Sequence, residues 1–235
     1  MTVFAPNLDI LPDAQKNLWS SLSAITEKGF TLYGGTAIAL RLGHRESVDF
    51  DFFTEFAVDA DDLVQSLALL KTARPLQVSL NTYTAIVDDP TTGAGVKFSF
   101  FGGLQMGRVG APDWTDDGIL RVASPLDLLA TKLKVILQRI EWKDYIDIVA
   151  LTSAGVPLAE GLAAAAALYP QTFPPSQSLK ALTWFEEGDL HRLSAADRAH
   201  LLTLSTNVRV LPEIARISDT LGSDVRNPND DPPHP

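Results

Sequence analysis

One short segment, residues 48–53, constrains the fold of this chain most, because acidic and aromatic residues alternate along it (V-D-F-D-F-F). Strand side chains point alternately to the two faces of a sheet, so Asp49 and Asp51 share a face, about 7 Å apart along the strand. Phe50 and Phe52 point to the opposite face, into a core. The segment therefore predicts a strand in a sheet with one apolar, buried face and one polar face.

The pattern of the chain changes at about Ser124. The first half mixes strand-like and helix-like segments, whereas the second half is almost entirely helical in pattern. We therefore expect an α/β (α+β) fold, in which a mixed sheet flanked by helices is followed by a helical C-terminal half. The expected division is an α/β domain over residues 1–122, a helical domain over 123–221 and a flexible, proline-rich tail over 222–235.

Periodicity and turn residues locate the expected elements. Helices are expected over 12–28, 36–42, 59–70, 124–139, 144–153, 158–168, 176–185 and 195–221, the last bent or broken at Pro212. Strands are expected over 30–33, 48–53, 76–87, 95–101 and 119–122, with a loop over 102–117. Glycines end the first two helices, at Gly29 and Gly43, and Ser124 with Pro125 begins the first helix of the second half.

Composition excludes several classes of protein. The chain has 29 acidic and 19 basic residues, a formal net charge of −10, and no cysteine. The acidic balance argues against a general electrostatic coat for nucleic acid, although a local basic site is compatible with it. The absence of cysteine excludes a disulfide scaffold, a cysteine zinc site and a thiol nucleophile. No secretory leader pattern is visible and no window approaches about 18 uninterrupted apolar residues, so we expect a cytoplasmic protein without a membrane span.

Two carboxylates side by side on a sheet repel each other unless a counter-charge is present. A divalent cation is the natural counter-charge, because Mg²⁺ favours one or two carboxylates together with phosphate oxygens. The preceding segment suits phosphate, because Gly34 and Gly35 let backbone N–H groups approach closely and Thr36 begins a helix. Together these features predict a site for a metal-bound nucleoside triphosphate. Separately, they fit a solvated strand face and a plain tight turn, and these alternatives stay open.

Residues 32–53, LYGGTAIALRLGHRESVDFDFF, also resemble a known family. They resemble the signature of the polymerase-β-like nucleotidyltransferase superfamily, which has a Gly-Gly or Gly-Ser turn, a short helix and then Asp-x-Asp. More narrowly, they resemble the AbiEii/AbiGii family of nucleotidyltransferase toxins. The positions that match the family motif are Gly34, Gly35, Thr36, Asp49 and Asp51.

A second segment, residues 132–148 (KLKVILQRIEWKDYIDI), is similar to the family's downstream motif of a helical lysine, an arginine and Lys/Arg-Asp-x-x-Asp. The matching positions are Lys132, Arg139, Lys143, Asp144 and Asp147. On one continuous helix the three bases, at i, i+7 and i+11, would form a stripe suited to a triphosphate. The alternatives stay open: Asp144 caps the next helix, Asp147 stabilises its first turn, and Arg139 pairs with one of them.

The resemblance implies an enzyme that binds an NTP with Mg²⁺ and transfers a nucleotidyl group to an acceptor, such as a tRNA 3′ end or a protein hydroxyl. It also implies a toxin with an antitoxin partner. The implied metal ligands are Asp49 and Asp51, the implied catalytic residues are these two with Lys132, Asp144 and Asp147, and the implied nucleotide-binding residues are Gly34, Gly35, Thr36, Arg139 and Lys143.

One position departs from the superfamily pattern. Many members supply a third carboxylate from a later strand, and the corresponding strand here has Ser99 at that place. Serine does not ionise, so it is a poor general base or metal bridge. Three alternatives follow: the site with two carboxylates suffices, Asp144 or Asp147 supplies the missing acid, or the protein is a catalytically degenerate module that binds nucleotide or another protein. Lys97, two residues earlier, is expected to be a solvated strand residue.

Overall fold

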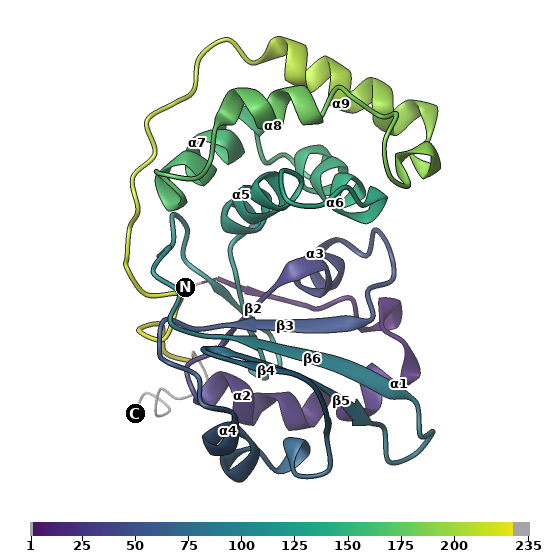
Figure 1. Cartoon of the computed structure of the whole chain (residues 1–235), viewed down its shortest axis with the longest axis vertical. Helices are drawn as coiled ribbons and strands as arrows, with labels where there is room; N and C mark the ends of the chain where they lie inside the picture. Colours follow the sequence, from purple (N-terminus) through teal and green to yellow (C-terminus); the bar gives the residue numbers. More distant parts are fainter. Residues whose placement is uncertain (1, 228–235) are drawn as a thin grey trace, which may run out of the picture. The chain divides into compact units, whose positions relative to one another are not determined.

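The computed structural model of the chain describes residues 2–227. Its contacts group into two compact units that no single cut in the sequence separates. Unit 1 consists of the chain through Gly107, Ala111–Ala123 and the segment that begins at Ser218, and unit 2 consists of Arg108–Gly110 and Ser124–Ile217. Unit 1 contains the sheet and unit 2 is helical (Figure 1), so the expected α/β fold with a helical C-terminal half is confirmed.

Unit 1 is built on a mixed sheet that has eight strands within the described residues, in the order β1-β7-β8-β2-β3-β6-β5-β4. The strands are β1 (Val3–Phe4), β2 (Thr31–Tyr33), β3 (Asp49–Phe53), β4 (Arg74–Ser79), β5 (Thr82–Asp88), β6 (Gly95–Phe101), β7 (Asp113–Thr115) and β8 (Arg121–Val122). The helices are α1 (Asp13–Leu18), α2 (Ser23–Glu27), α3 (Gly34–Leu42) and α4 (Ala60–Ser66), with short 3-10 turns at Leu8–Ile10, Trp19–Leu22 and Ala68–Leu70. Figure 1 shows α2 and α4 on one side of the sheet and α3 on the other.

The pairing of β3 in the middle of the sheet positions the acidic pair. β3 runs antiparallel to β2, with Tyr33 opposite Asp51, and parallel to β6 on its other side. Phe50 and Phe52 are 0% exposed, and both rings pack on the ring of Phe98 in β6. The sequence prediction is therefore confirmed for this strand, because one face is an aromatic core and the other carries the carboxylates.

The helix expected over residues 12–28 is divided into α1, a 3-10 turn and α2. Trp19 and Leu22, three residues apart, are both buried in that turn. A 3-10 turn has three residues per turn, so it aligns side chains at i and i+3 on one side, whereas an α-helix would separate them by about 60°. Burial of this pair accounts for the tighter turn. Gly29 closes the region in a left-handed conformation (φ 88°), as predicted.

Two segments of the sheet also differ from the expectation. The strand expected over 76–87 is a hairpin, because Asn81 adopts a left-handed conformation (φ 56°) and turns the chain between β4 and β5. The loop expected over 102–117 contains β7, which pairs with β1 and β8. A strand of three residues is too short to show an alternating pattern in the sequence.

The C-terminal segment of unit 1 is packed against the sheet. Leu221 is fully buried, and its carbonyl accepts a hydrogen bond of 2.8 Å from Oγ1 of Thr31 on β2. Arg121 on β8 donates to the carbonyl of Val225 at 3.3 Å. The expected flexible tail, residues 222–235, therefore has its described part packed in unit 1, and its last eight residues lie outside the described residues.

Unit 2 packs the helices α5 (Pro125–Val135), α6 (Trp142–Ser153), α7 (Leu158–Leu168), α8 (Pro175–Ala181) and α9 (Ala195–Asn207), with a 3-10 turn at Leu190–Arg192. α5 begins as the sequence predicts, because Ser124 caps it by accepting a hydrogen bond from the N–H of Asp127. The buried Asp127 carboxylate accepts hydrogen bonds from the N–H groups of Val109 (2.9 Å) and Gly110 (3.0 Å). Burial raises the pKa of the Asp127 carboxyl despite these hydrogen bonds.

Three helices of unit 2 end earlier than expected, among them α8, which ends at Ala181 instead of residue 185. α5 ends at Val135 instead of residue 139, because its last turn tightens: the N–H groups of Leu137 and Gln138 bond to carbonyls three residues back. α9 ends at Asn207, before Pro212 is reached. Among the described helices, none is long and apolar enough to cross a membrane by itself; α6 and α7 meet the length and composition only as a pair, which is bent by 119°.

Candidate functional site

The acidic pair lies on the polar face of β3 in unit 1. Asp49 and Asp51 are both half-buried, and β6 places Lys97 beside Asp49 and Ser99 beside Asp51. The Nζ atom of Lys97 lies 2.8 Å from Oδ2 of Asp49, and the two side chains are 37% and 30% exposed. A lysine expected to be solvated therefore supplies the counter-charge to one of the carboxylates. This contact follows from the parallel pairing of β3 with β6, which places Lys97 opposite Asp49 and Ser99 opposite Asp51.

The first turn of α3 meets Asp51. Gly34 begins this nine-residue helix in a left-handed conformation (φ 74°), which residues with a side chain rarely adopt. A Cβ atom on Gly34 would overlap the carboxylate of Asp51. Glycine at this position thus lets the carboxylate lie against the N-terminus of a helix, where the N–H groups and the helix dipole favour negative charge. The predicted glycine turn is the first turn of the helix itself.

The side chain of Thr36 links the start of α3 to the start of β3 by hydrogen bonds. Its buried hydroxyl lies 2.9 Å from Oγ of Ser47 and bonds to the backbone carbonyl of Asp49. Nearby, the guanidinium of Arg45 lies against Gly35, with Nη2 only 2.5 Å from where a Cβ atom on that glycine would stand. The side chain of Thr36 therefore has a structural task, and Arg45 adds a cation that was not among the predicted site residues.

Ser99 stands where the register places a third acidic residue. It is 3% exposed and is paired with Asp51 on β3 and with Thr84 on β5. Within residues 2–227, no group of three or more acidic or histidine side chains is arranged to hold a metal ion. The candidate metal centre is therefore the pair Asp49 and Asp51 alone. Two half-buried carboxylates on one face fit a cation that completes its shell with phosphate oxygens, as Mg²⁺ commonly does.

The residues of the downstream motif gather in unit 2, between α5 and α6. Nζ of Lys132 lies 2.7 Å from Oδ1 of Asp144 and 2.7 Å from Oδ2 of Asp147. The lysine is 5% exposed and both aspartates are 0% exposed. One buried ammonium thus bridges two buried carboxylates. Neither aspartate is the N-cap of α6, because Glu141 has that position.

The other two bases of the motif also pair with acids. Nε of Arg139 lies 2.9 Å from Oδ2 of Asp144, and Nζ of Lys143 lies 3.0 Å from Oε2 of Glu141. Burial alone would raise the pKa of the Asp144 carboxyl, but the charges of Lys132 and Arg139 outweigh it and hold that pKa below its ordinary value. The continuous stripe of bases is absent from the described helices, since α5 ends before Arg139.

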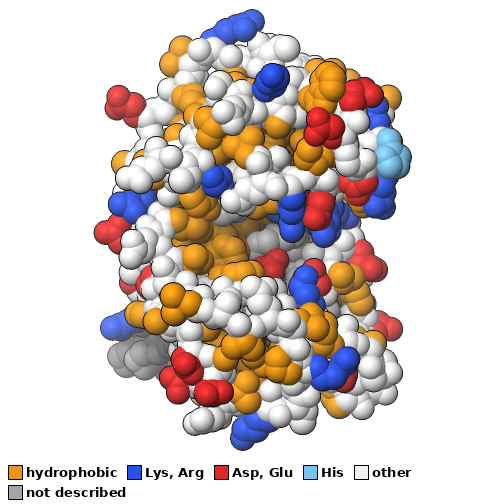
Figure 2. All heavy atoms as spheres, viewed as in Figure 1, with side chains coloured by type: hydrophobic (Ala, Val, Ile, Leu, Met, Phe, Trp, Pro, Cys, Tyr) orange, Lys and Arg blue, Asp and Glu red, His pale blue; other side chains and the backbone are white. Residues whose placement is uncertain are grey.

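Figure 2 shows Lys and Arg side chains interspersed with Asp and Glu on the visible face of the molecule. This mixture agrees with the net charge of −10. A surface with mixed charges suits a few local contacts with an anion better than binding that involves many phosphates of a nucleic-acid backbone.

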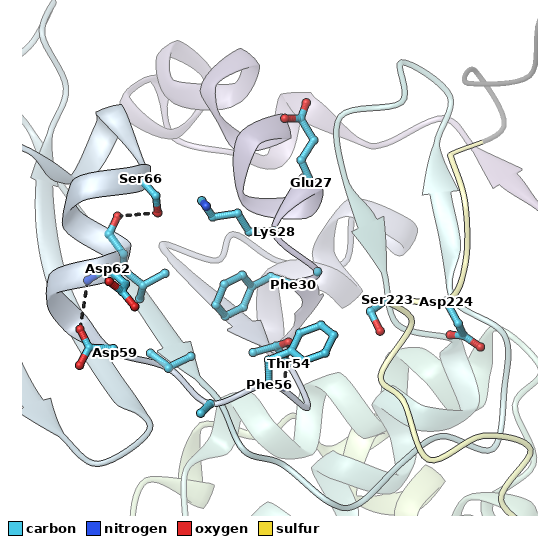
Figure 3. A pocket seen from close by; sticks show the side chains of 14 residues that line it. Glu27, Lys28, Phe30, Thr54, Phe56, Asp59, Asp62, Ser66, Ser223 and Asp224 are labelled. Atoms are coloured by element: carbon cyan, nitrogen blue, oxygen red, sulfur yellow. Dashed lines mark hydrogen bonds between the residues drawn. The ribbon is translucent and has the colours of Figure 1, made fainter.

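A separate pocket of ≈ 650 Å³ in unit 1 has a different lining (Figure 3). Phe30 and Phe56 lie at its centre, Lys28 follows the end of α2, Asp62 comes from α4, and Ser223 comes from the C-terminal segment. Its described lining includes none of the predicted site residues. The candidate site is therefore the polar face of β3 with the start of α3, and this pocket is not part of it.

These features define a class of protein. A strand that leads through Gly34 into a short helix, followed by a strand with two carboxylates on one face, is the arrangement of a nucleotidyltransferase. A profile of the family described as "Nucleotidyl transferase AbiEii toxin, Type IV TA system" matches residues 20–211, most of the chain. The chain therefore belongs to the AbiEii family of nucleotidyltransferase toxins of type IV toxin–antitoxin systems, as the two resembling segments implied. The family implies an antitoxin partner.

One relative among curated proteins is "Uncharacterized protein aq_aa25" of Aquifex aeolicus (strain VF5), which is 35% identical over 121 residues. The match covers 51% of this chain and 55% of that protein. The chain thus spans about half the length of this relative, and the family assignment rests on the profile match.

Proposed function

We propose that this protein transfers a nucleotidyl group from an NTP to an acceptor hydroxyl with the help of Mg²⁺, and that this reaction makes it a toxin. One observation carries the proposal: Asp49 and Asp51 share the polar face of β3, and Asp51 lies against Gly34 at the start of α3. A pair of carboxylates suited to a divalent metal and a helix N-terminus suited to phosphate thus occur together in unit 1.

The residues of unit 1 have distinct tasks in this proposal. Asp49 and Asp51 would hold the Mg²⁺, which when bound supplies charge neutralisation on the phosphates. The N–H groups of Gly34, Gly35 and Thr36 bind the β- and γ-phosphates at the start of α3. These contacts orient the triphosphate so that the acceptor oxygen attacks the α-phosphorus in line. The bond between the α-phosphorus and the bridging oxygen breaks, pyrophosphate leaves, and the proton of the acceptor hydroxyl passes to solvent water.

The catalytic roles that the resemblance gives to Lys132, Asp144 and Asp147 remain predictions. Within unit 2 the Lys132 ammonium pairs with both carboxylates. Any role in transfer therefore requires this pairing to be exchanged for contact with the substrate. The same holds for the predicted nucleotide-binding residues Arg139 and Lys143, which pair with Asp144 and Glu141.

We propose an RNA end, such as a tRNA 3′ end, or the hydroxyl of a protein side chain as the acceptor. The acidic chain and its interspersed surface charges argue against binding that depends on many backbone phosphates. Recognition of a short end or of one side chain needs few such contacts. Both acceptors therefore belong in the test.

The test uses the purified protein with each NTP, radiolabelled at the α-phosphate, and either total tRNA or a protein extract, in Mg²⁺ or in EDTA. We expect label to reach one class of acceptor only when the metal is present. Asp49→Asn and Asp51→Asn should each lower transfer on the order of 100-fold or more, because each removes one metal ligand at constant size. Asp61→Asn, an exposed acid at the start of α4, is the matched control and should leave transfer unchanged. Wild-type protein that labels neither acceptor with any NTP would contradict the proposal.

Ser99 favours a second candidate function, a degenerate module that binds nucleotide without transfer. Ser99 is paired with Asp51 across β6 and β3, at the position where the resemblance implied a third acid. Nucleotide binding by the wild type without any transfer would support this candidate. Transfer that appears only in Ser99→Asp would identify the missing acid as the cause.

A further inference from the structure

We infer that Lys97 is a counter-ion that a divalent metal displaces from Asp49 and that the triphosphate then binds. The lysine would thus affect both ligands of the site in opposite ways. It competes with the metal for Asp49, and it attracts the nucleotide. This inference rests on the proposed function, because it concerns the same carboxylates.

The geometry of the pair suits such an exchange. Lys97 and Asp49 are directly paired across the parallel strands β6 and β3, so both side chains emerge on the same face of the sheet. The ammonium lies 2.8 Å from Oδ2 of Asp49, at hydrogen-bond distance, and thus occupies an oxygen that a metal would need. The side chains are 37% and 30% exposed, so water reaches both partners of the ion pair.

A comparison with the second lysine–aspartate contact of the motif residues shows the difference. Lys132 and Asp144 are separated by a similar 2.7 Å, but their side chains are 7% and 0% exposed. Breaking a buried pair leaves uncompensated charges inside the protein, whereas an exposed pair is worth little and its partners are rehydrated when it opens. Of these two contacts, that of Lys97 is the one a ligand can exchange at small cost.

The displaced lysine remains close to the bound phosphates. Its Cα atom is fixed by the sheet next to Asp49, and the side chain is a flexible stem with an ammonium that offers three hydrogen bonds. A triphosphate that shares a metal with Asp49 and Asp51 brings its oxygens to this same face. A charge-assisted hydrogen bond from Lys97 to a phosphate oxygen therefore replaces the one to the carboxylate.

Removal of the lysine charge should thus act in opposite directions on the two ligands. Lys97→Met should bind Mn²⁺ alone about five- to tenfold more tightly, because a competing positive charge beside the metal has gone. It should bind nucleotide in saturating Mn²⁺ about tenfold more weakly, because the cation that pairs with phosphate after the metal has displaced it from Asp49 has gone. A lysine that only supports the fold would weaken both, or neither.

The experiment measures both affinities without any turnover. Mn²⁺ binding is followed by electron paramagnetic resonance, and binding of each of the four α,β-methylene nucleoside triphosphates by calorimetry in saturating Mn²⁺. Lys97→Arg keeps the charge and should behave like the wild type within about threefold. Lys71→Met, at an exposed lysine of the same unit, is the matched control and should change neither affinity. Lys97→Gln repeats the measurement with a polar, uncharged side chain if Lys97→Met does not fold.

The outcomes separate this inference from the proposed function. Tighter Mn²⁺ with weaker nucleotide in the uncharged variants supports the exchange. Mn²⁺ affinity that is unchanged or reduced in those variants overturns it while leaving the proposed function in place. A wild-type protein that binds neither Mn²⁺ nor any of the four nucleotides overturns both.

Discussion

Replacement of Lys132 by methionine should destabilise unit 2 strongly. Methionine keeps the length of the side chain and its apolar stem but removes the ammonium that lies 2.7 Å from both Asp144 and Asp147. Two carboxylates with 0% exposure then lose their common counter-charge. Breaking a buried ion pair from one side costs about 3–5 kcal/mol, and Arg139 still pairs with Asp144, so the loss falls mainly on Asp147.

Urea denaturation at pH 7, followed by circular dichroism, measures this change in the free energy of unfolding. The difference in the free energy of unfolding between Lys132→Met and the wild type should narrow as the pH is lowered, because the carboxylates that have lost Lys132 take up protons and become neutral. Lys143→Met is the matched control, since its ion pair with Glu141 is exposed (41% and 37%) and is worth at most about 1 kcal/mol.

A second variant tests the cause. Asp144→Asn and Asp147→Asn, added to Lys132→Met, remove the buried charges and should restore most of the lost stability. A loss below about 1 kcal/mol in Lys132→Met, or no recovery in the triple variant, would refute the reasoning. The single variant also tests the resemblance, because an unchanged fold with lost nucleotide binding would return Lys132 to the role of a substrate ligand.

Three further outcomes are expected. The pKa of the Asp144 carboxyl is lower in the folded than in the unfolded protein, where it is about 4, so this carboxyl stabilises the fold fully above that pH. Its contribution is lost as the pH falls through the lower pKa of the folded state, and urea midpoints of the wild type at pH 7, 5 and 3 should show this loss. Gly34→Ala should cost about 1–3 kcal/mol in unfolding experiments, because alanine at φ 74° is strained and its Cβ overlaps Asp51, and an unchanged midpoint would argue against the α3 geometry. Thr36→Val should cost about 1 kcal/mol by thermal unfolding, through the lost hydrogen bond to the carbonyl of Asp49, whereas Thr131→Val, at a part-buried hydroxyl of α5, shows the effect of a similar bond away from the site.

The acidic pair was predictable because its signal is local. Alternation along β3 is a property of adjacent residues, and it fixes the face of Asp49 and Asp51 whatever the partners of the strand are. The contact with Lys97 was not predictable in the same way. It depends on the parallel pairing of β3 with β6, whose residues lie 48 positions apart, and no local pattern specifies that register.

For the downstream motif, residues 132–148, the sequence predicted the residues but not their arrangement. The residue types were matched correctly, but a stripe of bases was expected because periodicity does not show where a helix ends. α5 ends at Val135, so the chain folds back and Lys132 meets Asp144 and Asp147 across two helices. At this end the N–H groups of Leu137 and Gln138 bond to carbonyls three residues back, and such a change in the last turn leaves no clear mark in the sequence.

The return of the chain to unit 1 at Ser218 has a consequence for synthesis in the cell. The sheet is otherwise complete at Ala123. The buried site of Leu221, whose carbonyl bonds to Thr31 on β2, the strand that leads into Gly34, nevertheless stays empty while the ribosome makes Ser124–Ile217. At typical elongation rates this interval lasts roughly 5–20 s. A nascent chain of this design completes the contacts between Leu221 and β2 only after its helical unit has been translated, so a chain truncated before Ser218 should fold its sheet without that support.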